Sequence, residues 1–244
     1  MLSDIFDEYS LGARVRPSLL ALLPFIITSH IVFPSLYNVV ATLFSIILSC
    51  GFITALAHYS RFEGRKTEKR LYRIWGGRPT TIMLRHEDST LDKHTKIRYH
   101  KYISQNIVDW HAPTSDDERN NPDEANGYYD SAIRWLLEKT RDTKTYRLLF
   151  KENISYGFRR NSRGIKWLGV LVSLLSLSLV LMYLYSSGEY LDLNKHALEY
   201  GVVAFSTIML LWWLFIVKDA WVKDAAYSYA SRLLAVCENL DKET

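Results

Sequence analysis

The stretch IKWLGVLVSLLSLSLVLMYLY, residues 165–185, decides the class of fold. Apart from Lys166 it carries no charge, and about 20 apolar residues in a helix cross the roughly 30 Å of hydrocarbon in a bilayer. The mean hydropathy of the whole chain is only −0.07, because charged segments elsewhere offset such stretches. The sequence therefore predicts a membrane protein with a sizeable part outside the bilayer.

Other segments have a similar length and composition when they are scanned with a window of about 19 residues. Together they predict an α-helical integral membrane protein with four transmembrane helices, arranged as two hairpins. The four predicted spans are Pro17–Ser35, Tyr37–His58, Ile165–Tyr185 and Tyr200–Val217. The predicted order is an N-terminus (1–16), hairpin 1 (17–58), a mixed, mainly helical domain (59–164), hairpin 2 (165–218) and a C-terminal amphipathic helix (219–244).

Basic residues predict how the chain is oriented in the membrane. The connector within each hairpin is poor in lysine and arginine, whereas the other flanks are rich in them. Basic flanks belong on the cytoplasmic side, so both termini and the central domain are expected in the cytoplasm. The basic flanking residues are Arg14, Arg16, Arg61, Arg65, Lys66, Lys69, Arg70, Arg159, Arg160, Arg163, Lys166, Lys218 and Lys223.

The central domain begins with RFEGRKTEKRLYRIW, which we expect to continue the second span as a basic helix. Paired glycines and a proline at 76–79 are strong helix breakers and end it. The following TTIMLR has strand character, KIRYHKYISQNIVDW favours a helix, and HAPTSDDERNNPDEANG is typical of a mobile acidic loop. A long helix is predicted from Tyr128 to about Phe158.

The tail DAWVKDAAYSYASRLLAVCENL is predicted to be an amphipathic helix. Its apolar face has two interpretations, packing against the central domain or contact with another subunit. The residues of this face are Trp221, Ala225, Leu233, Val236, Cys237 and Leu240.

The segment WGGRPTTIMLRH raises the question of an anion site. Its glycines allow a phosphate to approach the backbone, and arginine suits phosphate through its fork of N–H donors. Basic residues farther along alternate with aromatic ones, a pattern that holds nucleotides by charge and stacking. The alternative is that this segment only stops a helix and turns the chain. The candidate ligand-binding residues are Arg78, Thr80, Thr81, Arg85, Lys96 and Arg98.

Enzymatic chemistry has little support in the sequence. There is no GxxxxGK[ST] loop, no HExxH and no CxxC. His86, His94, His100 and His111 lie near carboxylates in sequence, but their spacing matches no compact zinc pattern. The acidic run Asp116, Asp117, Glu118, Asp123 and Glu124 is predicted to be a solvated loop. We therefore expect no metal, no cofactor and no enzymatic activity.

Polar side chains within the predicted spans have two interpretations. Small hydroxyl residues allow helices to approach and form hydrogen bonds across an interface, or they line a hydrated pathway in an oligomer. His30 is an ionisable residue in a span and is a functional candidate for that reason. The pore or helix-interface candidates are His30, Thr42, Ser45, Ser49, Ser173 and Ser176.

The layout resembles that of small four-span inner-membrane effector or sensor proteins of bacterial antiphage defence systems. The stretches that carry the resemblance are LGARVRPSLLALLP, WGGRPTTIMLRH and ENISYGFRRNSRGIKWLG. The channel component of Hailong-type systems and the membrane component of Kiwa-type systems are the named candidates. The resemblance is one of layout and assigns no site. It implies a multi-pass protein of the bacterial inner membrane that acts with a cytoplasmic partner encoded nearby.

These observations lead to a first hypothesis of a homo-oligomeric channel, gated when the cytoplasmic domain binds a nucleotide, a nucleic acid or a partner protein. The alternative is a membrane-anchored sensor or scaffold that has no pore and recruits a cytoplasmic defence protein. A membrane-bound enzyme that uses the histidine-rich and aspartate-rich domain is the third possibility.

Overall fold

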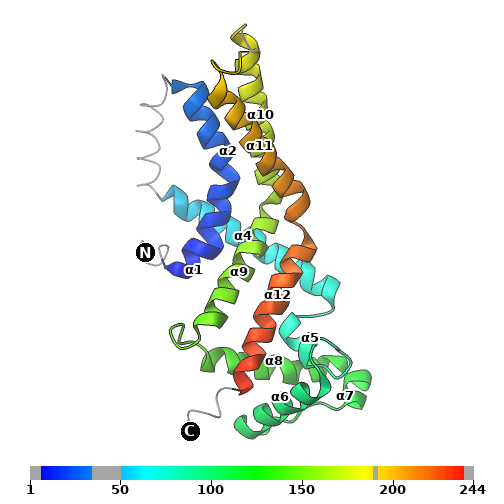
Figure 1. The fold of residues 1–244 in the computed structure, drawn as a ribbon. Coiled ribbons are helices and arrows are strands. Elements are labelled where there is room, and N and C mark those ends of the chain that lie inside the picture. The colour runs from blue at the N-terminus through cyan, green and yellow to red at the C-terminus, as the bar shows by residue number, and fades with distance from the viewer. Residues whose placement is uncertain (1–6, 35–50, 189–191, 239–244) are drawn as a thin grey trace. The chain divides into compact units, whose positions relative to one another are not determined.

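The computed structural model describes residues 7–34, 51–188 and 192–238. All regular elements in these residues are helices, and no strand is found among them. The chain divides into two units, Met1–Glu68 with Gly157–Val222, and Lys69–Tyr156 with Lys223–Thr244. We call them the first and the second unit; Figure 1 shows their helices.

The first unit contains a bundle of three apolar helices, α2 (Arg16–Val32), α10 (Lys166–Ser186) and α11 (Ala197–Leu211), which pack against one another. The short α1 (Glu8–Ser10) and the π-helical η1 (Leu11–Val15) lead into α2, and the π-helical η3 (Trp212–Ile216) extends α11. Three helices are therefore long and apolar enough to cross a membrane: Glu8–Val32, Lys166–Ser186 and Ala197–Ile216.

The fourth predicted span, Tyr37–His58, lies largely outside the described residues. Its end is described, and there the prediction of one uninterrupted helix is wrong. Gly51 has φ +88°, a left-handed conformation that an α-helix does not continue through. A new helix, α4 (Phe52–Trp75), begins directly after it.

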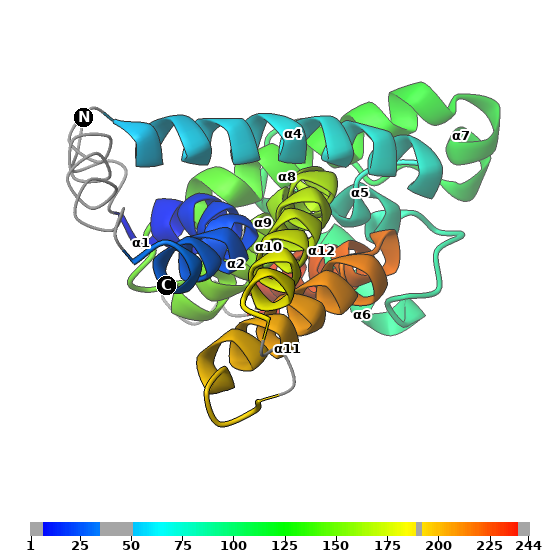
Figure 2. The same cartoon turned by 90° about the horizontal axis from the view of Figure 1, so that it is seen from above.

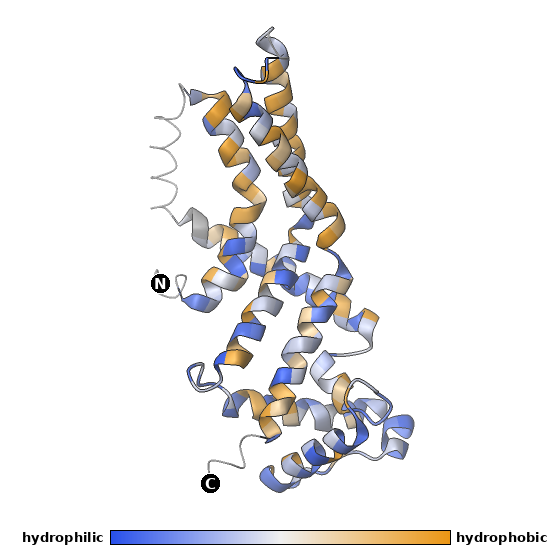
Figure 3. Cartoon of the chain, viewed as in Figure 1, coloured by the Kyte–Doolittle hydropathy of each residue, from blue (hydrophilic) through white to orange (hydrophobic). Residues whose placement is uncertain are grey.

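The bundle buries small and hydroxyl residues while it leaves large apolar side chains exposed. Helix α10 buries Gly169, Ser173 and Ser176 along with Val170, Val172, Val180 and Leu184, whereas Leu171 and Met182 are 64% and 65% exposed. Figure 3 shows the apolar character of α2, α10 and α11 along their length. Small and polar residues inside and large apolar residues outside are expected for a bundle in hydrocarbon. Burying a leucine there gives no hydrophobic free energy, because lipid tails are as apolar as leucine.

The first half of α4 and the end of α9 (Arg147–Gly164) pack closely in the first unit. A β-carbon at Gly164 would lie 2.6 Å from the backbone of Glu63, so only glycine permits this approach. Ser18 of α2 donates from Oγ to the carbonyl of Leu56 at 3.1 Å. Figure 2 shows the beginning of α4, which belongs to the first unit, lying across the direction of α2 and α10.

The second unit has its own apolar core. It is formed by α5 (Pro79–Leu84), α6 (Lys93–Asn106), α7 (Ser115–Asn120), α8 (Pro122–Lys139), most of α12 (Asp219–Leu234) and the 3₁₀-helix η4 (Ala235–Glu238). Leu233, Val236 and Cys237 of the tail are buried in this core. Packing of the tail against the central domain is therefore confirmed; Leu240 lies outside the described residues.

The predicted elements of the central domain are confirmed in part. The basic helix does end at Trp75, and α6 is a helix. The prediction of a strand at TTIMLR is wrong, because helix α5 begins at Pro79. All six residues of α5 are buried. The mobile loop is wrong as well: Thr114 and Asp117 form a capping box that starts α7.

The helix predicted from Tyr128 to Phe158 is two helices, α8 and α9. Between them the Asp142 carboxylate accepts hydrogen bonds from the backbone N–H of Lys144 and the hydroxyl of Thr145. Aspartate competes with helical hydrogen bonding in this way at turns, and the apolar periodicity on both sides conceals the break.

Candidate ligand site

The turn at Gly76–Gly77 joins α4 to α5 in the second unit. The N–H of Gly77 donates to the carbonyl of Tyr72 at 2.8 Å, and the two glycines have φ +82° and +148°. Pro79 then occupies the first turn of α5, where its missing N–H is not needed. The interpretation of this segment as a helix stop is confirmed.

Three of the predicted anion-binding residues meet helix α8. Arg78 forms an ion pair with Asp130, N–O distance 3.7 Å, and Thr81 donates from Oγ1 to the same carboxylate at 2.6 Å. Arg85 donates to the side-chain oxygen of Asn126 at 3.0 Å and to the carbonyl of Gly76 at 2.9 Å. A carboxylate of the chain thus stands beside Arg78, where a bound anion was predicted.

The other predicted ligand residues have different surroundings. Thr80 is buried. Lys96 of α6 donates from Nζ to the carbonyls of Arg85 and Asp88, both at 2.5 Å. Arg98 pairs with Glu238 of η4 at 2.6 Å. The six residues therefore do not converge on one ligand.

A cluster of ionisable and aromatic side chains connects α5, α6, α7 and α8. Glu118 of α7 accepts the backbone N–H of His86 at 2.9 Å and the hydroxyl of Tyr129 at 2.8 Å. The ring of His100 stacks on that of Tyr129 with centroids 5.7 Å apart, and it lies 5.4 Å from the ring of His86. Glu118 was predicted to belong to a solvated loop. This is wrong, because Glu118 lies in helix α7, is only partly exposed and accepts two hydrogen bonds within the cluster.

His100 is the most strongly perturbed histidine of this cluster. Its Nε2 lies 2.9 Å from the carbonyl oxygen of Leu84, which only accepts, so Nε2 carries the hydrogen. Burial lowers the pKa of His100 to about 4. Burial also raises the pKa of Tyr129, and its hydrogen bond to Glu118 raises it further. His100 is neutral near pH 7 and acts as a structural donor.

A cavity of about 610 Å³ lies beside the cluster, within the size range of small-molecule sites. Two acidic residues of its lining accept backbone hydrogen bonds: Asp88 accepts from the N–H of Thr90, and Asp92 accepts from the N–H of Thr95. Lys96 has three N–H donors, and its two carbonyl partners use two of them. Burial lowers the pKa of Lys96. The polar lining includes His86, Glu87, Asp88, Asp92, Lys93 and Lys96.

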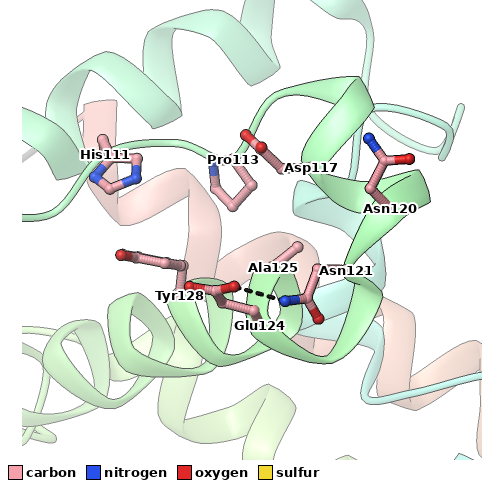
Figure 4. Close-up of a pocket in the computed structure, with 8 residues that line it drawn as sticks. All are labelled: His111, Pro113, Asp117, Asn120, Asn121, Glu124, Ala125 and Tyr128. Atoms are coloured by element: carbon pink, nitrogen blue, oxygen red, sulfur yellow. Dashed lines mark hydrogen bonds between the residues drawn. The ribbon is translucent and has the colours of Figure 1, made fainter.

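A second, smaller cavity of about 150 Å³ lies near the start of α8. Figure 4 shows its lining, with Asn121 donating to Glu124 at 2.7 Å and the Tyr128 ring across from His111. Its volume is below that of most small-molecule sites. No group of three metal-ligating side chains is found in the described part of the chain.

Two polar residues of the three-helix bundle form hydrogen bonds within their own helix. Ser173 and Ser176 are fully buried and donate to the carbonyls of Gly169 and Val172. Both hydroxyl groups are therefore satisfied inside α10. His30 is exposed near the end of α2. Three further candidates, Thr42, Ser45 and Ser49, lie outside the described residues.

Sequence reasoning missed Glu118, Tyr129 and the cavity. Only the capping box in front of Glu118 is visible in the sequence, and it predicts a helix rather than an acceptor for His86 and Tyr129. Comparisons of the chain with protein-family models, with curated proteins and with solved structures give no match.

Proposed function

We propose that the protein is a multi-pass sensor of the bacterial inner membrane, whose cytoplasmic second unit binds an anionic small molecule or nucleotide and passes the signal to the membrane. It has no enzymatic activity and acts together with a cytoplasmic partner protein. Both termini lie in the cytoplasm.

The observation that carries the proposal is the combination of a membrane bundle with a separate core that encloses a cavity. Lys93 and Lys96 supply cationic groups at this cavity, and the carboxylates of Asp88 and Asp92 accept hydrogen bonds from the backbone of Thr90 and Thr95. Helices α4, α9 and α12 each contribute residues to both units. A shift of these helices on ligand binding is therefore carried along the chain into the first unit.

Lys93 and Lys101 provide a matched test of the cavity. Both are exposed on α6, but only Lys93 lines the cavity. We would measure the melting temperature of the full-length protein in detergent with nucleoside triphosphates and with linear and cyclic dinucleotides. A ligand that binds in the cavity stabilises the wild type and Lys101→Gln, and stabilises Lys93→Gln less. Equal responses of the two variants would remove the cavity as the site.

Arg78 tests the other candidate position for the anion. Arg78→Ala removes the cation, whereas Asp130→Asn removes the competing charge and keeps an acceptor for Thr81. If the anion binds at Arg78, the first change weakens binding and the second strengthens it. If the cavity is the site, neither change alters affinity by more than about two-fold, since exposed pairs contribute little.

A homo-oligomeric channel is the second candidate function. It is favoured by Thr42, Ser45 and Ser49, which have the i, i+3, i+7 spacing of one helical face, and by the exposure of His30 on α2. The described spans favour the sensor instead, because Ser173 and Ser176 are turned inward and bonded within α10.

Ion flux separates the two functions. Purified protein is reconstituted in liposomes that contain a potassium-sensitive or pH-sensitive dye, and its mass in detergent is measured by light scattering. The sensor gives no flux with or without nucleotide at any oligomeric mass. A flux that Ser45→Leu abolishes would establish the channel and reject the sensor without a pore.

A further inference from the structure

Three arginines of the first unit, Arg14, Arg61 and Arg65, lie near one another, and their charges act on each other. Arg61 and Arg65 are one turn apart on α4, so they share a face of the helix. Arg14 of η1 lies over the ring of Tyr9, 5.1 Å from its centroid, and donates to Ser10 Oγ at 3.0 Å. Within the described residues no carboxylate forms an ion pair with Arg14, Arg61 or Arg65.

Acidic residues near this arginine cluster have other partners. The Asp7 carboxylate caps the backbone and hydroxyl of Ser10. Glu63 pairs with Lys66 at 2.8 Å, and Glu68 pairs with Arg160 at 2.8 Å. The pKa of Arg61 is lowered, mainly by burial and next by the charges of Arg14 and Arg65. The guanidinium groups stay charged, so they repel one another.

The cluster lies where the apolar bundle begins. Arg14 lies in η1, which leads into α2, and the hydrogen bond from Ser18 to Leu56 holds the start of α2 against α4. Tyr59 and Phe62 are 47% and 57% exposed on α4, and the Lys66 ammonium lies 4.1 Å from the ring centroid of Phe62. Exposed aromatic and basic side chains at the end of apolar helices mark the membrane–water interface.

We propose that Arg14, Arg61 and Arg65 bind the phosphate group of an anionic phospholipid. The guanidinium fork matches phosphate oxygens in charge and geometry, and an anionic leaflet attracts basic groups at its surface. A membrane lipid fits this site better than a soluble anion because the cluster adjoins the start of an apolar helix and exposed aromatic rings. The site is independent of the cavity in the second unit.

The test uses the full-length protein in a neutral detergent, titrated with phosphatidylglycerol or with phosphatidylcholine. Phosphatidylglycerol is expected to raise the melting temperature of the wild type, and phosphatidylcholine is not. Arg61→Gln and Arg65→Gln each weaken the response to phosphatidylglycerol about five-fold. Because each change relieves repulsion, neither lowers the melting temperature when anionic lipid is absent.

Lys66→Gln is the matched control, since it removes one charge from the same helix but from a residue paired with Glu63. It keeps the full response. An equal loss in Lys66→Gln would mean diffuse attraction and would overturn the site. Protection by inorganic phosphate that equals protection by the lipid would overturn it too, in favour of a soluble anion.

Arg61→Lys keeps the charge and removes the fork, so it covers the case in which Arg61→Gln fails to fold. It is expected to fold and to bind phosphatidylglycerol more weakly than the wild type. Native mass spectrometry then counts the lipid that stays bound. Retention that is unchanged in Arg61→Lys and in Arg65→Gln would reject the proposal.

Discussion

Gly169 of α10 lies directly against the indole of Trp213 in η3, so closely that a β-carbon at position 169 would be 2.1 Å from Cε2 of the ring. Trp213 is fully buried beside Ala21, Ile165 and Val217. This end of the three-helix bundle is therefore built around one large ring and one residue without a side chain.

Gly169→Ala is expected to destabilise the bundle by at least the roughly 1–3 kcal/mol of an overpacked core. The melting temperature in detergent measures this loss. Gly201→Ala is the control on α11, because no atom lies within 4 Å of its new methyl group. It should stabilise the protein by up to about 1 kcal/mol through helix propensity. Equal effects of the two changes would contradict the contact with Trp213.

The ion pair between Glu68 and Arg160 is largely buried, with side-chain exposures of 20% and 11%. Glu68→Ala leaves a buried guanidinium without its carboxylate, which costs about 3–5 kcal/mol. Glu63→Ala removes the partner of the more exposed Lys66, and this costs about 0–1 kcal/mol. Thermal unfolding should therefore separate the two variants clearly.

The double variant Glu68→Leu with Arg160→Met provides a second check on this pair. Apolar residues of similar volume often replace a buried ion pair without loss. The double variant should regain most of the stability that Glu68→Ala loses. A double variant as unstable as Glu68→Ala would mean that the two residues act through other contacts.

The pKa of His100 predicts how stability changes with pH. It is about 4 in the folded protein and about 6.5 in an unfolded chain. Between these values the unfolded state binds more protons, so stability is complete above about pH 6.5 and falls as the pH drops to 4. The loss amounts to about 3 kcal/mol.

Urea unfolding of the full chain at pH 7 and at pH 4.5 measures this change. His100→Gln keeps an N–H donor for the carbonyl of Leu84 and has no titrating group. The difference between the wild type and this variant isolates His100 from the carboxylates that titrate in the same range. Parallel losses in both proteins would show that His100 does not contribute.

The two glycines after α4 should respond differently to alanine. Gly76 has φ +82° with no atom within 4 Å of a new β-carbon, whereas a β-carbon at Gly77 would lie 3.0 Å from Nη2 of Arg85. Gly76→Ala should cost about 1–2 kcal/mol for the left-handed backbone. Gly77→Ala should cost more, because φ +148° is a backbone conformation that essentially only glycine adopts and because Nη2 of Arg85 must also shift from its hydrogen bond to the carbonyl of Gly76.

Gly127→Ala, in helix α8, is the control for both changes because it has open space and an ordinary helical backbone. It should leave stability unchanged or slightly increased. If Gly77→Ala melts at the same temperature as Gly76→Ala, the contact of Arg85 with the turn is unimportant.

Local signals in the sequence predicted several elements correctly. Length and apolar composition identify α2, α10 and α11 as candidate spans, because a bilayer requires these properties of each helix separately. Gly76, Gly77 and Pro79 end α4 through their own backbone preferences. The amphipathic tail contains the residues that the second unit buries, since burial requires an apolar face.

Other features depend on partners that are distant in the chain. The apolar segment TTIMLR has the composition of a strand, but Thr80–Leu84 form part of helix α5, which begins at Pro79 and is buried in the second unit. Lys96 and Arg98 are close in sequence, yet Lys96 binds two carbonyls and Arg98 pairs with Glu238. No local pattern shows which donor meets which acceptor, so the predicted anion site joined residues that the fold separates.

By itself, the sequence determined that this is a helical protein with spans suited to a membrane and a polar part with its own apolar faces. Only the tertiary structure decided that Glu118 meets the buried Tyr129 and His100 next to a cavity, and that Arg14 lies near Arg61 and Arg65. The reason is physical: hydrophobicity and backbone preference act within one segment, whereas counter-charges and cavities depend on residues that only folding brings together.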